Sequence, residues 1–261
     1  MTPAALTGSP KASPLGACFA DLSKRGRRAL VVYVPAGHPD PERSLDLWHE
    51  LEHSGADVIE VGVPFSDPMA DGPVIQSSSQ QALARGITFD RVLDLIARSA
   101  LKIPVVLFSY LNPVLAAGPT ALERAATAGA AGILITDLPV GSDAMLEKRF
   151  ASGPLDFVRL VAPTTPTDRM AHIARHGSGF VYLISRLGVT GERAELPPDL
   201  PFTIARLRQS TTLPVCVGFG VSTPSQAAAV ARLADGVVVG SAIVKAAEQG
   251  VARAGALTRE L

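Results

Sequence analysis

The sequence predicts an α/β protein, a single-domain (β/α)8 barrel preceded by a short N-terminal helix. Eight short apolar runs alternate with amphipathic stretches along the 261 residues, and such alternation indicates a parallel sheet. Runs such as ALVVYV at 29–34 show no polar alternation, which is typical of strands covered on both faces. The competing fold is a doubly wound open sheet. It usually has a glycine-rich turn after its first strand, and VPAG at 34–37 is not such a turn.

The individual elements follow from the same patterns. A helix over 18–25 precedes the first strand, and Asp40 followed by Pro41 predicts the start of the next helix, which Gly55 ends. Further strands are expected at 56–61, 104–109, 131–136, 156–161, 179–184, 214–217 and 236–239. Helices are expected at 75–84, 90–99, 119–128, 141–150, 166–176, 199–209, 222–233 and 241–248. Residues 1–15, rich in Pro, Ser, Gly and Ala, are expected to form a flexible tail, and 16–261 the catalytic barrel domain.

Composition restricts the classes of function. The 24 Lys and Arg residues balance the 24 Asp and Glu residues, so we expect no nucleic-acid-binding surface. Cys18 and Cys216 lack metal or redox spacing, and they are interpreted as free thiols in a reducing compartment. No apolar run reaches the roughly 18 residues of a membrane span, and the N-terminus lacks a secretory signal pattern. We therefore expect a cytoplasmic protein without membrane contact.

Two carboxylates stand out near the end of the second strand. In this barrel class the active site lies at the C-terminal strand ends. Glu60 shares a strand face with Val58 and Gly62, and a carboxylate buried there is costly unless it is solvated, paired or used. Asp71 follows in a proline-rich loop, and two carboxylates in different surroundings are typical of acid–base chemistry. The alternative is that Glu60 pairs with a rim arginine and Asp71 only caps the helix beginning near Pro73.

Glycines follow the last two strands. GFG at 218–220 and Gly240 with Ser241 at a helix start predict a phosphate site, because exposed amides at a helix N-terminus favour anions. The alternative for GFG is a tight turn. The stretch SRLGVTGER at 185–193 predicts a lid over the substrate, or otherwise an ordinary surface loop.

The histidines carry less information. His49 with His53 and His172 with His176 are spaced as on one helix face, and we interpret both pairs as solvated rather than metal-binding. His38, in the loop after the first strand, lies nearer the expected site, and the sequence leaves its role undecided. No metal site, P-loop or nucleophilic serine elbow is recognised.

Longer motifs carry a resemblance to a known family. IEVGVPFSDPMADGPVIQ at 59–76 closely resembles the signature of the tryptophan synthase alpha subunit family. The stretches VVYVPAGHPD, VLFSYLNPV, ILITDLP, YLISRLGVTG, VGFGVST and VVVGSAIVK resemble its other strand ends in order, over about 19–245. The resemblance implies a retro-aldol lyase that splits indole-3-glycerol phosphate into indole and glyceraldehyde 3-phosphate without a cofactor.

The same resemblance implies roles for individual residues. Glu60 would be the acid–base that protonates the indole ring at C3, and Asp71 would accept a hydrogen bond from the indole N–H. Thr190, in the lid, would help to position Asp71, and Tyr110 would lie near the glycerol chain. The indole pocket would consist of Tyr33, Phe108, Thr136, Tyr182 and Phe219, and the phosphate site of Gly191, Gly220, Gly240 and Ser241.

The resemblance also implies a partner. Alpha subunits pair with a beta subunit in an α2β2 complex, and the beta subunit uses pyridoxal phosphate to join indole to serine. Asp67 would face that partner. One departure is the first-strand loop, which is usually Thr-Ala-Gly-Asp-Pro and here is PAGHP at 35–39. We expect activity to survive this change, with Pro35 and His38 bearing on loop closure and communication with the partner.

Three other functions remain open on the sequence alone. The chain could be a stand-alone lyase that releases free indole. It could be a non-catalytic barrel that binds and activates a partner, although the presence of Glu60 and Asp71 argues against this. It could also be a barrel enzyme acting on a different sugar phosphate.

Overall fold

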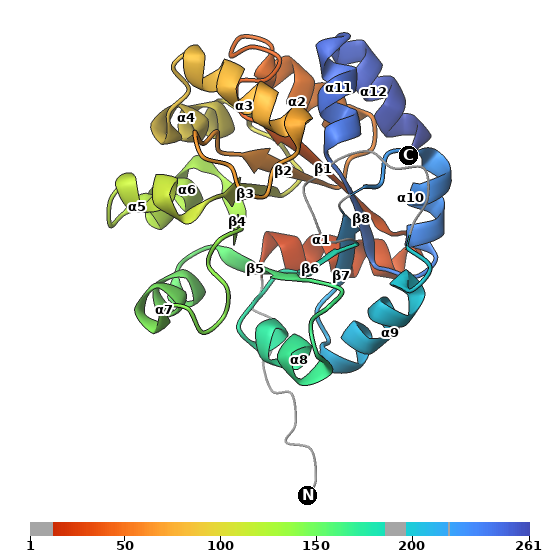
Figure 1. The fold of residues 1–261 in the computed structure, drawn as a ribbon. Coiled ribbons are helices and arrows are strands. Elements are labelled where there is room, and N and C mark those ends of the chain that lie inside the picture. Colours follow the sequence, from red (N-terminus) through yellow and green to blue (C-terminus); the bar gives the residue numbers. More distant parts are fainter. Residues whose placement is uncertain (1–12, 186–196, 219) are drawn as a thin grey trace, which may run out of the picture.

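Eight parallel strands close into a barrel in chain order, from β1 to β8 (Figure 1). The computed structural model describes residues 13–185, 197–218 and 220–261. β1 pairs with β2 on one side and with β8 on the other, which closes the sheet and excludes the open-sheet alternative. The strands are β1 Ala29–Pro35, β2 Val58–Gly62, β3 Val105–Ser109, β4 Ala130–Ile135, β5 Asp156–Val161, β6 Val181–Ile184, β7 Val215–Gly218 and β8 Gly236–Val239.

Helices surround the barrel and one helix closes its end (Figure 1). They are α1 Pro14–Lys24, α2 Ser44–His53, α3 Pro73–Ala84, α4 Phe89–Ser99, α5 Leu111–Ala116, α6 Ala121–Ala128, α7 Ala144–Ser152, α8 Thr167–Arg175, α9 Leu200–Ser210, α10 Pro224–Ala231, α11 Ser241–Glu248 and α12 Val251–Glu260. The predicted fold class is therefore confirmed, and the predicted bounds of β5, β8 and α11 are the observed ones.

The starts of α1 and α2 differ from prediction in ways that their capping contacts explain. α1 begins at Pro14, because the Ser13 hydroxyl caps it by accepting from the Gly16 N–H at 3.0 Å. Pro14 and Leu15, assigned above to the tail, thus belong to the helix. The Asp40–Pro41 pair does not start α2. Asp40 accepts from the Arg43 N–H at 2.8 Å and closes a turn, so α2 begins at Ser44.

α5 was not predicted at all. Asn112–Pro113 suggests a loop, but proline is tolerated in the first turn of a helix. The Asp137 carboxylate accepts from the Leu111 N–H at 2.7 Å, so a side chain from the loop after β4 satisfies the start of α5.

The strands lie between two apolar clusters. Both faces of each strand are therefore buried, which explains why the strand sequences are apolar throughout. The inner cluster fills the barrel and includes Val31, Val58, Val106, Val158 and Val238, with Leu15, Phe19 and Leu22 of α1 closing one end. The outer cluster lies between the barrel and the surrounding helices and includes Ile59, Val61 and Val63. β2 thus alternates as predicted, with Val58 inward and Ile59 outward, so Glu60 faces inward.

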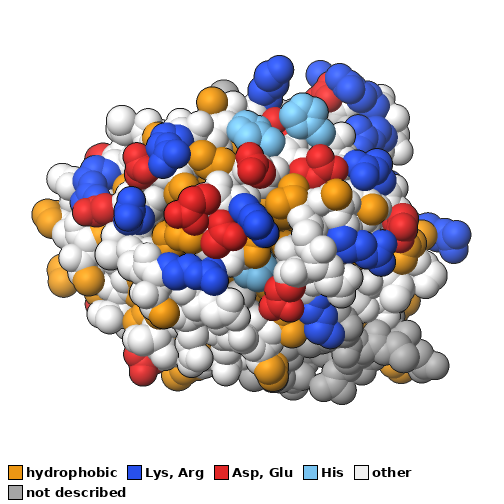
Figure 2. All heavy atoms as spheres, turned by 90° about the horizontal axis from the view of Figure 1, so that it is seen from above, with side chains coloured by type: hydrophobic (Ala, Val, Ile, Leu, Met, Phe, Trp, Pro, Cys, Tyr) orange, Lys and Arg blue, Asp and Glu red, His pale blue; other side chains and the backbone are white. Residues whose placement is uncertain are grey.

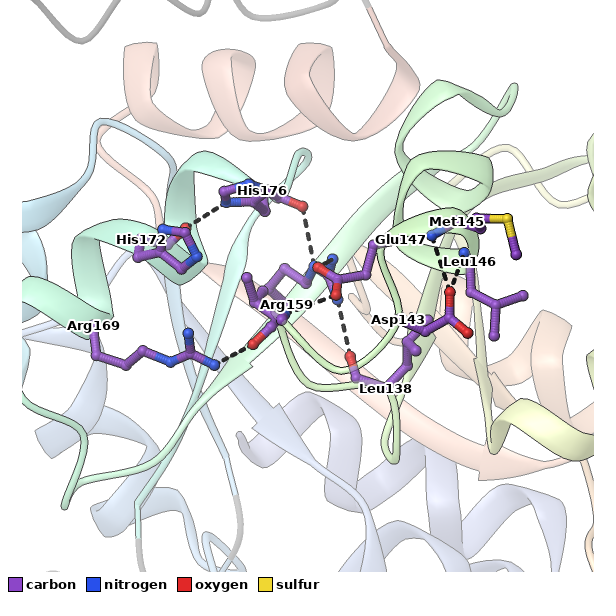
Figure 3. A network of polar contacts seen from close by, with 11 residues as sticks. Leu138, Asp143, Met145, Leu146, Glu147, Arg159, Arg169, His172 and His176 are labelled. Atoms are coloured by element: carbon purple, nitrogen blue, oxygen red, sulfur yellow. Dashed lines mark hydrogen bonds and ion pairs between the residues drawn. The ribbon is translucent and has the colours of Figure 1, made fainter.

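The outer face of β5 holds a buried ion pair (Figure 3). Arg159 is 3% exposed and donates to Glu147 at 3.3 Å. It also donates to the carbonyls of Leu138 and His176, each at 3.0 Å, and its guanidinium lies 3.8 Å from the centre of the Phe157 ring. A buried charge with this many partners is a satisfied structural element.

The face shown in Figure 2 carries interspersed acidic and basic side chains with scattered apolar ones. On this face the positive side chains do not form a continuous stripe, such as the binding of a nucleic-acid backbone would require. The described residues contain no group of three or more histidine, cysteine or acidic side chains that could hold a metal ion. None of their helices has the length and apolarity to cross a membrane.

Candidate active site

Glu60 lies near the C-terminal end of β2 and points into the barrel. Its side chain is 0% exposed, and within the described part of the chain neither carboxyl oxygen has a hydrogen-bond partner. Burial raises the pKa of this carboxyl from 4.5 to about 8, because the charged form loses its water without gaining a partner. No arginine among the described residues pairs with Glu60, as the alternative considered above would require. At neutral pH Glu60 is mainly protonated and can donate a proton.

Asp71 lies in the loop between β2 and α3 and is also buried. Its carboxylate is hydrogen-bonded to the Tyr110 hydroxyl, which in turn accepts from the Ala70 N–H at 2.8 Å. Burial raises the pKa of Asp71 to about 6, and the Tyr110 hydrogen bond opposes this rise. Asp71 is therefore mainly ionised at neutral pH.

The local backbone supports this orientation of Asp71. The Gln76 amide donates to the Asp71 carbonyl at 2.8 Å, so the first turn of α3 holds the end of the loop. The N-cap residue of α3 is Gly72, and the Asp71 carboxylate is directed to the Tyr110 hydroxyl instead of to the start of this helix. The alternative in which Asp71 only caps α3 is thus wrong. The environment instead gives the two carboxyl groups opposite states, and such pairs divide the acid and base roles.

Aromatic side chains line the inside of the barrel beside Glu60. Tyr33 is the β1 residue paired in register with Glu60, and its ring meets Phe108 edge-on with centroids 5.1 Å apart. Tyr182 is 4% exposed and belongs to the same inner cluster. Burial raises the pKa of Tyr33 and Tyr182 well above the ordinary value, and the nearby Glu60 adds to both shifts. The two tyrosines thus stay neutral.

Two strand-end glycines make room for these tyrosines, a feature that the sequence reading missed. A Cβ at Gly62 would lie 2.3 Å from the Tyr33 hydroxyl, and one at Gly218 would lie 2.2 Å from the Tyr182 hydroxyl. Any larger residue would displace the rings. The signal in the sequence is a glycine that ends an apolar strand, next to a strand that carries a tyrosine.

The predicted phosphate end lies next to this aromatic pocket. Gly240 is the N-cap of α11 and Ser241 its first residue, so free amides are available at that end of the helix. A Cβ at Gly240 would be 3.3 Å from the Tyr33 ring. Gly220 has a φ of 102°, a left-handed conformation that favours glycine.

Two of the remaining predicted residues, Thr136 and Asp67, lie in the described part of the structure. Thr136 follows β4, is half-buried, and its N–H donates to the Ser109 carbonyl at 3.0 Å. Asp67 is exposed on the loop before Asp71, where its carboxylate accepts from the Ser66 hydroxyl. Three predicted residues lie outside the described residues, as does most of the predicted lid: Thr190, Gly191 and Phe219.

The fold and the carboxyl pair are typical of an acid–base enzyme built on a (β/α)8 barrel. The sequence model of the tryptophan synthase alpha chain family matches residues 19–260. The chain therefore belongs to the tryptophan synthase alpha chain family, whose members are carbon–carbon lyases that cleave indole-3-glycerol phosphate.

Individual relatives agree along nearly the whole chain. The tryptophan synthase alpha chain of Citrifermentans bemidjiense is 49% identical over 230 residues, which cover 87% of this chain and 86% of the relative. That of Geobacter sulfurreducens is 46% identical and covers 91% of both. Among solved structures, a tryptophan synthase chain from Mycobacterium tuberculosis matches with a TM-score of 0.88 at 38% identity, covering 96% of this chain and 97% of that one. The alpha subunit from Legionella pneumophila matches with a TM-score of 0.87 at 34% identity, covering 96% and 97%.

Proposed function

We propose that Glu60 and Asp71 carry out the retro-aldol cleavage of indole-3-glycerol phosphate in this chain. The observation that carries the assignment is the contrast between the two carboxyl groups. Glu60 has no partner among the described residues and a pKa of about 8, whereas Asp71 is held by Tyr110 and has a pKa of about 6. One neutral acid and one anion therefore stand at the same strand end at neutral pH.

Each group has a defined task in this proposal. The Glu60 carboxyl gives its proton to C3 of the indole ring, and the positive charge that forms is shared with the ring nitrogen. The Asp71 carboxylate accepts a hydrogen bond from the ring N–H and stabilises that charge.

The carbon–carbon bond then breaks and its electron pair returns to the ring, which restores neutral indole. The glycerol hydroxyl loses its proton to the Glu60 carboxylate and becomes the aldehyde of glyceraldehyde 3-phosphate. The proton that Glu60 gave is thus regained, so the step balances without any cofactor.

The pocket walls suit the two halves of this substrate. Tyr33, Phe108 and Tyr182 present aromatic faces beside Glu60, which favours a flat indole ring. The backbone at Gly220, Gly240 and Ser241 would bind the phosphate, supported by the position of Gly240 at the start of α11. Thr136 would close the pocket at the end of β4.

We infer further that indole passes to a beta subunit, in which pyridoxal phosphate supports its condensation with serine. The loop that carries Asp67 supports an interface, because Asp67 is exposed and the neighbouring Met69 is 78% exposed. The free cysteines Cys18 and Cys216 fit a reducing cytoplasmic environment.

One assay tests the proposal directly. Purified chain is given indole-3-glycerol phosphate, and indole is measured with and without an added tryptophan synthase beta subunit. Indole release that rises on formation of a complex is the expected result. Release that is the same with and without the beta subunit, with no complex formed, would identify a stand-alone lyase. No release under either condition would remove the lyase assignment.

A further inference from the structure

His38, which the sequence left undecided, makes a specific buried contact. Its side chain is 2% exposed, and its Nε2 atom lies 3.0 Å from the carbonyl oxygen of Val244 in α11. A carbonyl only accepts, so Nε2 carries the hydrogen and donates it. Burial lowers the pKa of His38, so the ring is neutral and Nδ1 is an acceptor. Among the described residues Nδ1 has no partner, so the bond to Val244 is the polar contact that holds this ring.

A second contact joins the β1 segment to α11. It is at the N-terminus of the helix, where Gly240 approaches the Tyr33 ring so closely that a Cβ would lie 3.3 Å from it. Val244 itself is 0% exposed and belongs to the inner cluster together with Tyr33. β1 and its loop therefore hold α11 both at its N-cap and one turn further along.

The same loop is also fixed on its other side, toward the carboxyl pair. The Ala36 N–H donates to the carbonyl of Gly62, the last residue of β2, at 2.9 Å. A Cβ at Gly37 would lie 2.5 Å from Ile87 and 3.3 Å from Ala82 of α3.

α3 begins two residues after Asp71, and Arg85, just beyond its end, donates to the Pro39 carbonyl. The loop at 36–39 therefore packs against α3, which follows Asp71, and against α11, whose N-cap is Gly240.

We propose that His38 is a positioning residue that sets the phosphate-binding end of α11 relative to Glu60 and Asp71. This inference rests on the proposed function, since it takes the N-terminus of α11 as the phosphate site. His38 contacts α11 at Val244, one helical turn beyond that N-terminus. It would therefore act through Val244 and not by contact with the substrate. Its loss would let α11 shift along or about its axis, and the phosphate end would lose affinity while the indole end would keep it.

The test compares His38→Leu with His38→Gln and His38→Asn in the full chain. Leucine fills the space and removes the donor. The glutamine amide reaches the position of Nε2 and keeps the donor, whereas the asparagine amide reaches only that of Nδ1. The measurements are KM and kcat for indole-3-glycerol phosphate, the inhibition constant of inorganic phosphate, the dissociation constant of indole, and the melting temperature.

For His38→Leu we expect KM and the phosphate inhibition constant to rise about fivefold, as fits the loss of one buried hydrogen bond. We expect kcat to change less than about twofold, the indole dissociation constant to stay that of the wild type, and His38→Asn to resemble His38→Leu. His38→Gln should restore most of the phosphate affinity. The comparison of glutamine with asparagine remains decisive if the leucine variant does not fold.

Two results would overturn the inference. One is phosphate inhibition equal to that of the wild type in both His38→Leu and His38→Asn. The other is an equal weakening of phosphate and indole together with a lowered melting temperature and no rescue by glutamine, which would mean a merely structural role. A wild-type chain that binds phosphate but releases no indole would contradict the proposed function, and it would leave the His38 comparison of phosphate binding intact.

Discussion

Replacing Glu60 by glutamine should destroy activity and raise stability at the same time. Glutamine has almost the same shape but cannot donate and regain a proton, so we expect kcat to fall by at least ~10²-fold. The stability effect comes from the buried carboxyl group. It ionises near 4.5 in the unfolded chain and near 8 in the folded one, so between these pH values folding takes up a proton.

The sign and size of the stability effect follow from that difference. Because the folded state binds more protons, the free energy of unfolding of the wild type falls by about 1.4 kcal/mol for each pH unit between 4.5 and 8. Glu60→Gln lacks this dependence. The free energy of unfolding of the variant should therefore exceed that of the wild type by less than about 1 kcal/mol at pH 5, by at most about 3 kcal/mol at pH 7 and by at most about 5 kcal/mol above pH 8.

Urea unfolding at pH 5, 7 and 8.5 measures the stability difference, and indole release measures the activity. The matched control is Glu123→Gln in α6, where the same substitution is made at an exposed side chain. A stability gain that is the same at all three pH values would refute the burial argument. Turnover within a few-fold of the wild type would remove Glu60 from the mechanism.

Three further changes test the rest of the site. The profile of kcat/KM against pH should rise near pH 6 as Asp71 ionises and fall near pH 8 as Glu60 loses its proton; a flat profile from pH 5 to 9 would contradict this. Tyr110→Phe removes a hydrogen bond that lowers the pKa of Asp71. In assays of indole release, the rise of kcat/KM with pH should therefore move to higher pH, and kcat/KM at neutral pH should fall about tenfold. Gly62→Ala puts a Cβ 2.3 Å from the Tyr33 hydroxyl, so we expect a loss of about 1–3 kcal/mol in urea unfolding and at least tenfold in turnover; unchanged values would mean that Tyr33 moves freely.

The sequence predicted the architecture well because strand and helix periods are local signals. β5, β8 and α11 have the predicted bounds, and in β8 and α11 a run of valines and the glycines at 236 and 240 mark those bounds. The starts of α1 and α2 were missed although local contacts of Ser13 and Asp40 set them, whereas the omission of α5 involves a distant residue. Asp137, from the loop after β4, accepts from the first N–H of α5, and this partner is 26 residues away, so a local sequence pattern does not reveal it.

Within the site, the sequence predicted that Glu60 lies on the same strand face as Val58 near the end of the strand, but not that Tyr110 holds Asp71. The Tyr110 hydroxyl reaches Asp71 and Ala70 from a position 40 residues further along the chain. His38 is a similar case, because its partner Val244 lies 206 residues away. Contacts of this kind depend on how the barrel closes, and composition or spacing does not encode them in any local pattern.

Two buried glutamates show how the closed barrel gives the same residue type two different environments. Glu147 and Glu60 are both nearly inaccessible, and both lie close to the barrel wall. Glu147, on the outside, binds the Arg159 guanidinium at 3.3 Å and the Gly141 N–H at 2.7 Å, so its burial stabilises the fold (Figure 3). Glu60, on the inside, has no such partner in the described chain, and its pKa rises to about 8. A carboxyl group that destabilises the fold at neutral pH is free to give its proton to a substrate, whereas one held by an arginine is not.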